Sequence, residues 1–184
     1  MRCLPRVCDW SASVGILLLL LAPGPASQAQ NVTEDQVKAA YVYNFAKFVE
    51  WPSRDFPSPT APLRLCVLDD RSLELELIQI AKGKAVAGRP VIVVPIQNRD
   101  QSRDCHILFI GSSQERQVRH IIEVLRETNV LTVGETKGFV EAGGIITFVL
   151  QDDRVQFEVN HKAAKRAGLS ISSRLLAVAK AVLE

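Results

Sequence analysis

Two cysteines carry the most reactive chemistry in the body of this chain. Cys66 and Cys105 follow the first 29 residues, whereas Cys3 and Cys8 lie within them. In an oxidising compartment two such cysteines are most simply paired, and closing a loop of about 40 residues stabilises the folded chain by about 4 kcal/mol. The alternatives are a reactive thiol or a Cys–His catalytic pair with His106. Both need a free thiolate, which an oxidising compartment disfavours.

Asp69 and Asp70 are candidates for a ligand cleft, because they follow an apolar segment that is typical of a strand. Open α/β sheets bind ligands beyond the carboxyl ends of their strands, and paired carboxylates there could hold a metal ion or a ligand amine. The alternative is a strand-to-helix turn with Asp70 near the start of the helix. The sequence favours this alternative.

The remaining motifs predict no catalytic, cofactor or metal site. His106, His120 and His161 lack the spacing of metal ligands, and the chain has neither a Gly-x-Ser-x-Gly elbow nor a phosphate-binding loop. The formal net charge is only +2, and the basic residues are scattered. We therefore expect no nucleic-acid partner.

The first residues indicate that the protein is exported. Arg2 supplies a positive start, residues 14–22 form an apolar run, and Ser27 and Ala29 are the small residues that a signal peptidase requires. These features predict a secretory signal peptide over residues 1–29. The alternative is a buried N-terminal helix, because the apolar run is too short for a permanent membrane span.

Residues 30–184 have the length of a single domain. No cysteine directly follows the apolar run, so we expect no lipid anchor at the cut. We expect this domain to be soluble in the periplasm.

The order of apolar segments predicts an α/β fold, a three-layer sandwich with a mixed, mainly parallel sheet and helices on both faces. Near-continuous apolar strands that alternate with helices are typical of parallel sheets, and the last two expected strands are close enough for an antiparallel hairpin. The expected strands are residues 63–68, 91–94, 106–110, 130–133, 145–150 and 155–159, and the expected helices are 73–81, 114–127, 160–168 and 172–182.

A helix opens the domain. Thr33 and Gln36 form a capping box, and the helix should run to about Glu50, where Trp51 precedes a proline. A proline-rich connector over residues 52–62 follows.

The apolar arc of this first helix is wider than one core stripe requires. Val37, Tyr41, Phe45 and Phe48 can fill the stripe. One interpretation is a deeply buried helix. The other is a helix shared between the core and a partner surface, with an interface formed by Val42, Val49 and Trp51.

Several segments resemble the YfiR-like family, and their joint order covers nearly all of residues 30–184. The opening helix and its Trp51-Pro52 end are the longest match. The other matching segments are Leu65–Leu68, Gly88–Val91, Cys105–Ile110, Val130–Gly134, Gly143–Ile146, Phe157–Asn160 and Ile171–Leu176.

The resemblance implies a non-enzymatic periplasmic regulator. Such proteins bind the periplasmic sensor region of an inner-membrane diguanylate cyclase and hold it inactive, which lowers cyclic di-GMP and disfavours biofilm. An outer-membrane-linked protein can sequester the repressor. Cys66 and Cys105 match the disulfide positions of the family, and we expect a homodimer without a cofactor.

This chain also departs from the family pattern. Residues 141–154 lack the second cysteine pair of a characterised member, and residues 168–173 lack the basic and imidazole side chains found there. A small-ligand site is therefore not transferred to this chain. The alternatives are a periplasmic small-ligand-binding module with its cleft near Asp69 and Asp70, an accessory protein of a sensor histidine kinase, and an exported enzyme with an unrecognised site.

Overall fold

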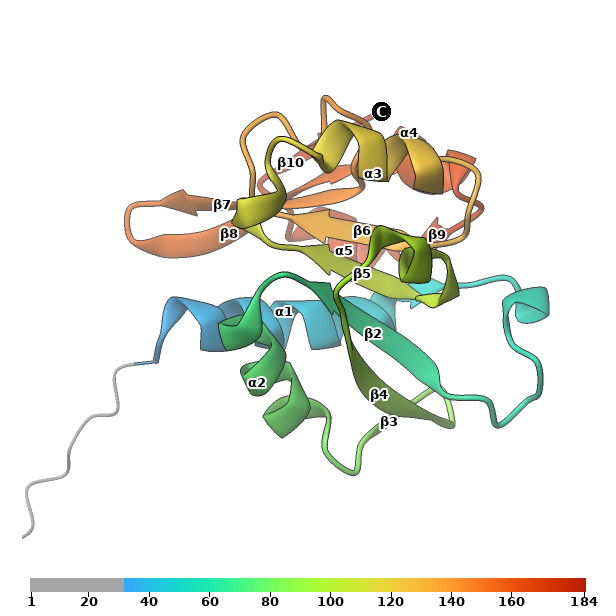
Figure 1. The fold of residues 1–184 in the computed structure, drawn as a ribbon. Helices are drawn as coiled ribbons and strands as arrows, with labels where there is room; N and C mark the ends of the chain where they lie inside the picture. Colours follow the sequence, from blue (N-terminus) through green and yellow to red (C-terminus); the bar gives the residue numbers. More distant parts are fainter. Residues whose placement is uncertain (1–31) are drawn as a thin grey trace, which may run out of the picture. The chain divides into compact units, whose positions relative to one another are not determined.

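The computed structural model describes residues 32–184, which cluster as one unit, and the predicted signal peptide over residues 1–29 lies outside the described residues. A mixed, mainly parallel sheet with strand order β10-β8-β7-β6-β5-β2-β4-β3 organises this unit (Figure 1). Within this sheet, as residues 32–184 form it, only the β7–β8 and β3–β4 pairs are antiparallel. The predicted α/β fold class is therefore confirmed. Within residues 32–184, no helix combines the length and the apolar character that crossing a membrane requires.

The observed elements follow the expected order. The strands of the main sheet are β2 (Leu63–Leu68), β3 (Ala85–Val86), β4 (Arg89–Ile96), β5 (Ile107–Ile110), β6 (Leu131–Gly134), β7 (Ile146–Gln151), β8 (Arg154–Asn160) and β10 (Ala181–Leu183). A separate antiparallel pair joins β1 (Val49–Glu50) to β9 (Ser170–Ile171). The helices are α1 (Glu34–Phe48), α2 (Arg71–Ala81), α3 (Val118–Leu125), α4 (His161–Arg166) and α5 (Ser173–Ala177), with 3₁₀ turns η1 (Ser53–Asp55), η2 (Arg99–Asp104) and η3 (Ser112–Gln114).

The two faces of the sheet build two separate cores. Alternate residues of a strand point to opposite faces, so Leu65 of β2 packs with α1 and α2, whereas Cys66 packs with α3. The larger core contains an aromatic cluster in which the ring of Phe45 lies 5.1 Å from that of Phe157 and 5.9 Å from that of Phe148. Helices therefore cover both faces, as the near-continuous apolar strands predicted.

The interpretation of Val42 and Val49 as a second, partner-facing surface is wrong. Only 1% of Val42 and 5% of Val49 is exposed, and both belong to the larger core. Residue 49 lies in β1, which pairs with β9, so this part of the chain is covered on more than one side. The capping box of α1 is confirmed, because the amides and side chains of Thr33 and Gln36 bond reciprocally.

The C-terminal segment also differs from the expectation of one helix over residues 172–182. Helix α5 ends at Ala177, and β10 then joins the sheet beside β8. The amide of Lys180 donates to the carbonyl of Phe157 at 2.8 Å. The backbone of this segment therefore gains hydrogen bonds along β8, and its β-branched valines are better suited to a strand than to a helix.

Two glycines make room for a buried aromatic ring. The ring of Phe139 lies between Gly134 and Gly144, and a Cβ atom on either glycine would come within 2.4 Å or 2.2 Å of that ring. The region therefore serves the smaller core, in which Phe139 is 1% exposed.

Candidate functional site

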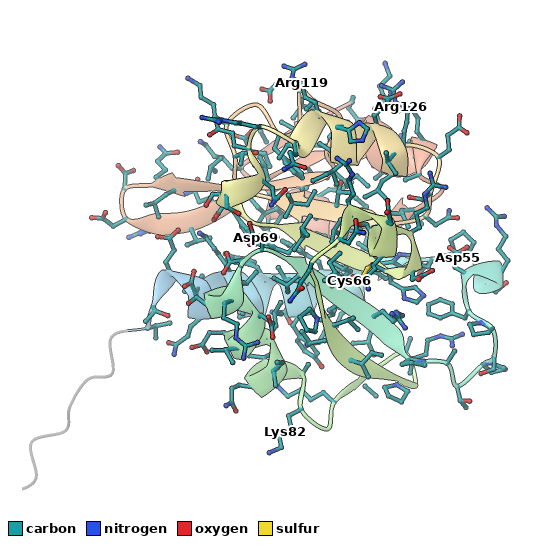
Figure 2. The ribbon with its side chains drawn as sticks, viewed as in Figure 1. Asp55, Cys66, Asp69, Lys82, Arg119 and Arg126 are labelled. Carbon is teal, nitrogen blue, oxygen red and sulfur yellow. A yellow bond between two sulfur atoms is a disulfide. The ribbon has the colours of Figure 1, made fainter. Side chains whose placement is uncertain are left out.

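Two clefts lie at opposite ends of the parallel strands. The carboxyl-end cleft, of about 560 Å³, is lined by Val67, Asp69, Asp70, Arg71, Glu74, Pro95, Ile96, Gln97 and Gln114. The amino-end cleft, of about 500 Å³, is lined by Asp55, Pro57, Ala61, Pro62, Arg64, Arg103, Asp104, Cys105, His106, Thr128, Asn129 and Val130. Figure 2 shows Asp55 and Asp69 toward opposite sides of the described unit, with Cys66 between them.

At the carboxyl end, both candidate carboxylates accept hydrogen bonds from within the chain. Asp70 caps α2, because its Oδ1 atom accepts from the amide of Leu73 at 3.0 Å. The Oδ2 atom of Asp69 accepts from the side-chain Nε2 of Gln114 at 3.0 Å and from the Ser113 hydroxyl. These bonds lower the pKa of Asp69, whereas burial raises the pKa of Asp70. The pair joins β2 to α2 and to η3, as expected of a strand-to-helix turn.

Close backbone packing supports this turn. Asp69 has a positive φ of 60°, and a Cβ atom at position 111 would lie 2.6 Å from its carbonyl oxygen. Gly111 is therefore required for the approach of the two segments. Within residues 32–184, no three His, Cys, Asp or Glu side chains are grouped as a metal site.

At the amino end, an aromatic stack covers the starts of the strands. The Phe56 ring stacks on the His106 imidazole, with the two ring centroids 4.4 Å apart. The Arg89 guanidinium lies over the Phe56 ring, 3.7 Å from its centroid. Arg89 also donates to the carbonyls of Ser58 and Ala61 at 2.8 and 3.1 Å. The proline-rich connector is thereby attached to β4, and the stack combines apolar rings with a cation.

His106 is the centre of this end and is held as a neutral imidazole. Its Nδ1 atom accepts from the amide of Arg64 at 3.1 Å, which leaves the ring proton on Nε2. Burial lowers the pKa of His106, and the charges of Arg64 and Arg89 lower it further. The indole of Trp51 donates to the carbonyl of His106 at 3.2 Å. The side chain of His106 therefore organises the cleft wall.

The disulfide excludes the alternative of a Cys–His catalytic pair. Cys66 and Cys105 are bonded to each other, with their Cα atoms 5.8 Å apart. β2 and β5 are neighbouring parallel strands, so the bond joins the middle of one strand to the start of the next. Cys105 thus lines the amino-end cleft without a thiolate.

Two polar atoms in the amino-end cleft have no partner among the described residues. The Oδ2 atom of Asp55 and the Nε atom of Arg64 are buried and form no hydrogen bond in residues 32–184. Burial raises the pKa of Asp55, and the nearby Arg54 opposes this shift. Since an unpaired buried polar atom is costly, both residues of this cleft wall would be stabilised by a polar group that reached these atoms.

The structure groups some of the predicted residues and separates others. Trp51 and Cys105 lie together at the amino end, Asp69 and Asp70 lie at the carboxyl end, and both valines of the predicted interface lie in the core. Sequence reasoning missed Phe56, Arg64 and Asp55. The sequence did contain one signal for this grouping. Parallel strands that start near residues 63, 106 and 130 begin at the same edge of the sheet, so the residues at their starts lie close together.

Comparisons with known proteins agree with this fold. A sequence model described as YfiR/HmsC-like matches residues 35–180, so the chain belongs to this family. A comparison with curated proteins gives no match.

The matches among solved structures include two at low sequence identity. A conserved domain protein from Vibrio cholerae O1 biovar El Tor is 10% identical with a TM-score of 0.54, and the match covers 83% of this chain and 61% of that one. The ABC domain in complex with L-Trp from Streptococcus pneumoniae is 12% identical with a TM-score of 0.49, and the match covers 77% of this chain and 59% of that one. The chain therefore spans about three fifths of each.

Proposed function

We propose that this member of the YfiR/HmsC-like family is a non-catalytic periplasmic regulator. It binds the periplasmic sensor region of an inner-membrane diguanylate cyclase and holds the cyclase inactive, which lowers cyclic di-GMP. The observation that carries this proposal is the family match over residues 35–180. The Cys66–Cys105 bond supports it, because such bonds persist in oxidising compartments.

Repression of this kind needs only differential binding. A regulator that binds the inactive state of the sensor more tightly than the active state shifts the population by that difference in free energy. An outer-membrane-linked protein that sequesters the regulator would reverse the shift by mass action. The carboxylates of Asp69 and Asp70 already hold the fold together, so the mechanism does not use them as reacting groups.

We assign the docking surface to the amino end. Trp51 and Phe56 are only partly buried there, and aromatic side chains beside polar groups are frequent anchors of protein interfaces. Asp55 and Arg64 line the cleft there, so an acidic and a guanidinium side chain are available to a partner. Trp51 thus keeps the interface role predicted for it, whereas the two valines beside it lose theirs.

The direct test adds the purified protein to intact spheroplasts of a strain that lacks its gene. The added chain spans residues 30–184, reaches only the outer side of the inner membrane, and should lower intracellular cyclic di-GMP. Photo-crosslinking in the same spheroplasts should attach it to a membrane protein with a diguanylate cyclase domain. An unchanged level of cyclic di-GMP, or crosslinking only to a histidine kinase, would reject the cyclase as the partner.

A second candidate function is small-ligand binding at the amino-end cleft. The unpaired acid and guanidinium atoms of Asp55 and Arg64 favour a ligand that carries both an amine and a carboxylate. A ligand that binds only the folded state raises the free energy of unfolding. A thermal-shift screen of amino acids should then show a rise in Tm that Arg64→Gln abolishes. No shift from any of them would remove this candidate.

A further inference from the structure

The solvent-facing side of α2 carries an apolar stripe. Leu75 and Ile78 are 48% and 41% exposed, and Lys82 continues the stripe at the end of the helix. Because successive residues of an α-helix are about 100° apart, positions 75, 78 and 82 lie within about 60° of one another around its axis. Apolar side chains of a surface helix normally face the core, so this stripe is available to a second surface.

The two carboxylates of α2 lie on other sides of the helix. The Oε1 atom of Glu76 accepts from the side chain of Gln36 on α1 at 3.5 Å. Glu74 is 7% exposed and forms an ion pair with Arg71. The exposed stripe thus combines apolar side chains with a cation.

Three exposed lysines lie where α1 and α2 end, and we call Lys47, Lys82 and Lys84 the lysine corner. The ammonium groups of Lys47 and Lys84 both lie over the Tyr43 ring, 4.5 and 5.1 Å from its centroid, so the ends of the two helices are adjacent. Among residues 32–184, none of the three lysines forms an ion pair. The helix dipole accounts for Lys47 in the last turn of α1. It does not account for Lys84, which follows the end of α2.

The lysine corner lies at the same end of the sheet as the amino-end cleft. α2 starts after the carboxyl end of β2 and returns to the start of β4, where the amide of Val91 donates to the carbonyl of Lys84 at 3.0 Å. Figure 2 shows Lys82 pointing away from the rest of the described unit. Glu50 is the acid nearest to Lys47 along the chain. The corner is therefore locally positive, although the formal net charge of the whole chain is only +2.

We propose that the lysine corner, Leu75 and Ile78 dock together on a membrane surface that contains anionic phospholipids. The ammonium groups contact the headgroup phosphates, and the apolar side chains and lysine stems reach the boundary of the acyl region. For an exported protein this surface is the periplasmic leaflet of the inner membrane. Two apolar side chains and three lysines make the docking weak and reversible. The inference does not rest on the proposed function, because the partner is a lipid surface and not a sensor region.

Vesicle flotation tests the docking without any partner protein. Residues 30–184 are mixed with vesicles of phosphatidylglycerol and phosphatidylethanolamine, or with vesicles of phosphatidylcholine alone. The protein should float with the anionic vesicles at low salt and stay behind with the zwitterionic ones. Binding should weaken as sodium chloride is added, because the salt screens the lysine charges.

Substitutions in the lysine corner locate the contact. Lys82→Gln should lower the vesicle partition constant roughly fivefold, because it removes one lysine from the surface. Lys82→Glu with Lys84→Glu should lower it by roughly twenty-five-fold or more, since the two new carboxylates also repel the headgroups. Ile78→Ser should weaken binding by a smaller factor and leave the salt dependence unchanged.

A matched control separates the lysine corner from overall charge. Lys162→Glu with Lys165→Glu makes the same change of charge on α4, which Figure 1 shows toward the opposite side of the described unit from α2. This variant should bind anionic vesicles as the wild type does. Urea midpoints show whether each variant keeps its fold. Lys82→Gln suffices for the test if the double variant is unstable, because Lys82 has no ion pair to lose among residues 32–184.

Four results would overturn the proposal. They are a wild-type protein that does not float with anionic vesicles at low salt, equal binding to phosphatidylcholine, a folded Lys82→Gln variant that binds as well as the wild type, and a control variant that loses as much binding as the lysine-corner variant. The last result would assign the binding to overall charge and not to this surface.

Discussion

The two ends of the parallel sheet contain similar residue types but use them differently. At the carboxyl end, Asp70 accepts a hydrogen bond from the turn that contains it, and Asp69 accepts one from the side chain of Gln114 in η3. At the amino end, Asp55 and Arg64 keep buried atoms that have no partner among residues 32–184, beside the partly exposed Trp51. In open α/β sheets ligands usually bind at the carboxyl end. Here the carboxylates at the carboxyl end are already hydrogen-bonded, which favours the amino end as the binding site. The position of a site thus depends on which polar groups lack a hydrogen-bond partner.

The difference originates in how each end is closed. A helix starts directly after Asp70, and the amide of Leu73 needs the cap that Asp70 supplies. The amino end is closed by the proline-rich connector, which the stack of Arg89, Phe56 and His106 keeps in place, and the disulfide joins the strands β2 and β5 beneath it. Four predictions test this contrast.

Loss of the disulfide should have the largest effect. The double substitution Cys66→Ala with Cys105→Ala removes a crosslink that closes 39 residues, which should lower the free energy of unfolding by about 4 kcal/mol in the chain-entropy description. Urea denaturation measures the loss. Hydrogen exchange should rise at residues 104–107 more than at residues 69–72. An equal rise at both ends would contradict the contrast.

Truncation of Trp51 should weaken partner binding more than it weakens the fold. Loss of an aromatic anchor typically costs about 2 kcal/mol, or roughly a thirtyfold rise in Kd for the sensor region. Isothermal titration with the sensor region that crosslinking identifies gives the affinity of the Trp51→Ala variant. Leu75→Ala on α2 is the control, because Leu75 is 48% exposed and lies away from the cleft. Equal affinities for both variants would remove the amino end from the interface.

Substitution of Asp70 should affect the fold alone. Asp70→Ala removes the cap of α2 and should lower the free energy of unfolding by about 1 kcal/mol. Repression should remain at the wild-type level when the two proteins are equally abundant. Loss of repression by a well-folded Asp70→Ala protein would instead support a ligand or partner site at the carboxyl end.

The smallest expected effect is a pH dependence that originates at the amino end. Because burial lowers the pKa of His106, the unfolded chain binds more protons than the folded one as the pH falls below about 6.5. The contribution of His106 to stability is complete above that pH and is lost as the pH falls toward the folded-state pKa. His106→Asn removes the titrating group but keeps an acceptor for the Arg64 amide. The urea midpoint of this variant should therefore vary less than that of the wild type as the pH falls below about 6.5.

The sequence was sufficient for the local structure but not for the site. Alternating apolar segments and the capping box predicted the order of the elements, because these signals are local. The final helix was predicted too long, since only the edge of β8 makes a strand of residues 181–183 favourable. The wide apolar arc of α1 reflected burial on several sides, which a helix in isolation does not reveal.

The grouping at the amino end depends on long-range packing. Phe56 and His106 are 50 positions apart in the numbering and meet only when the connector folds over the strand starts. Trp51 was predicted as an interface residue for its size and position, and its partial exposure keeps that prediction open. Unpaired atoms such as those of Asp55 and Arg64 become visible only once every neighbouring hydrogen bond is known.

Intracellular cyclic di-GMP is the most direct measure of the central claim, that the amino end represses a cyclase from the periplasm. It should be measured in a strain that lacks the gene and carries exported wild-type, Trp51→Ala or Asp70→Ala protein at matched levels. The account predicts that the wild type and Asp70→Ala lower cyclic di-GMP and that Trp51→Ala does not. Equal cyclic di-GMP in all three strains and in the strain without the gene would contradict it.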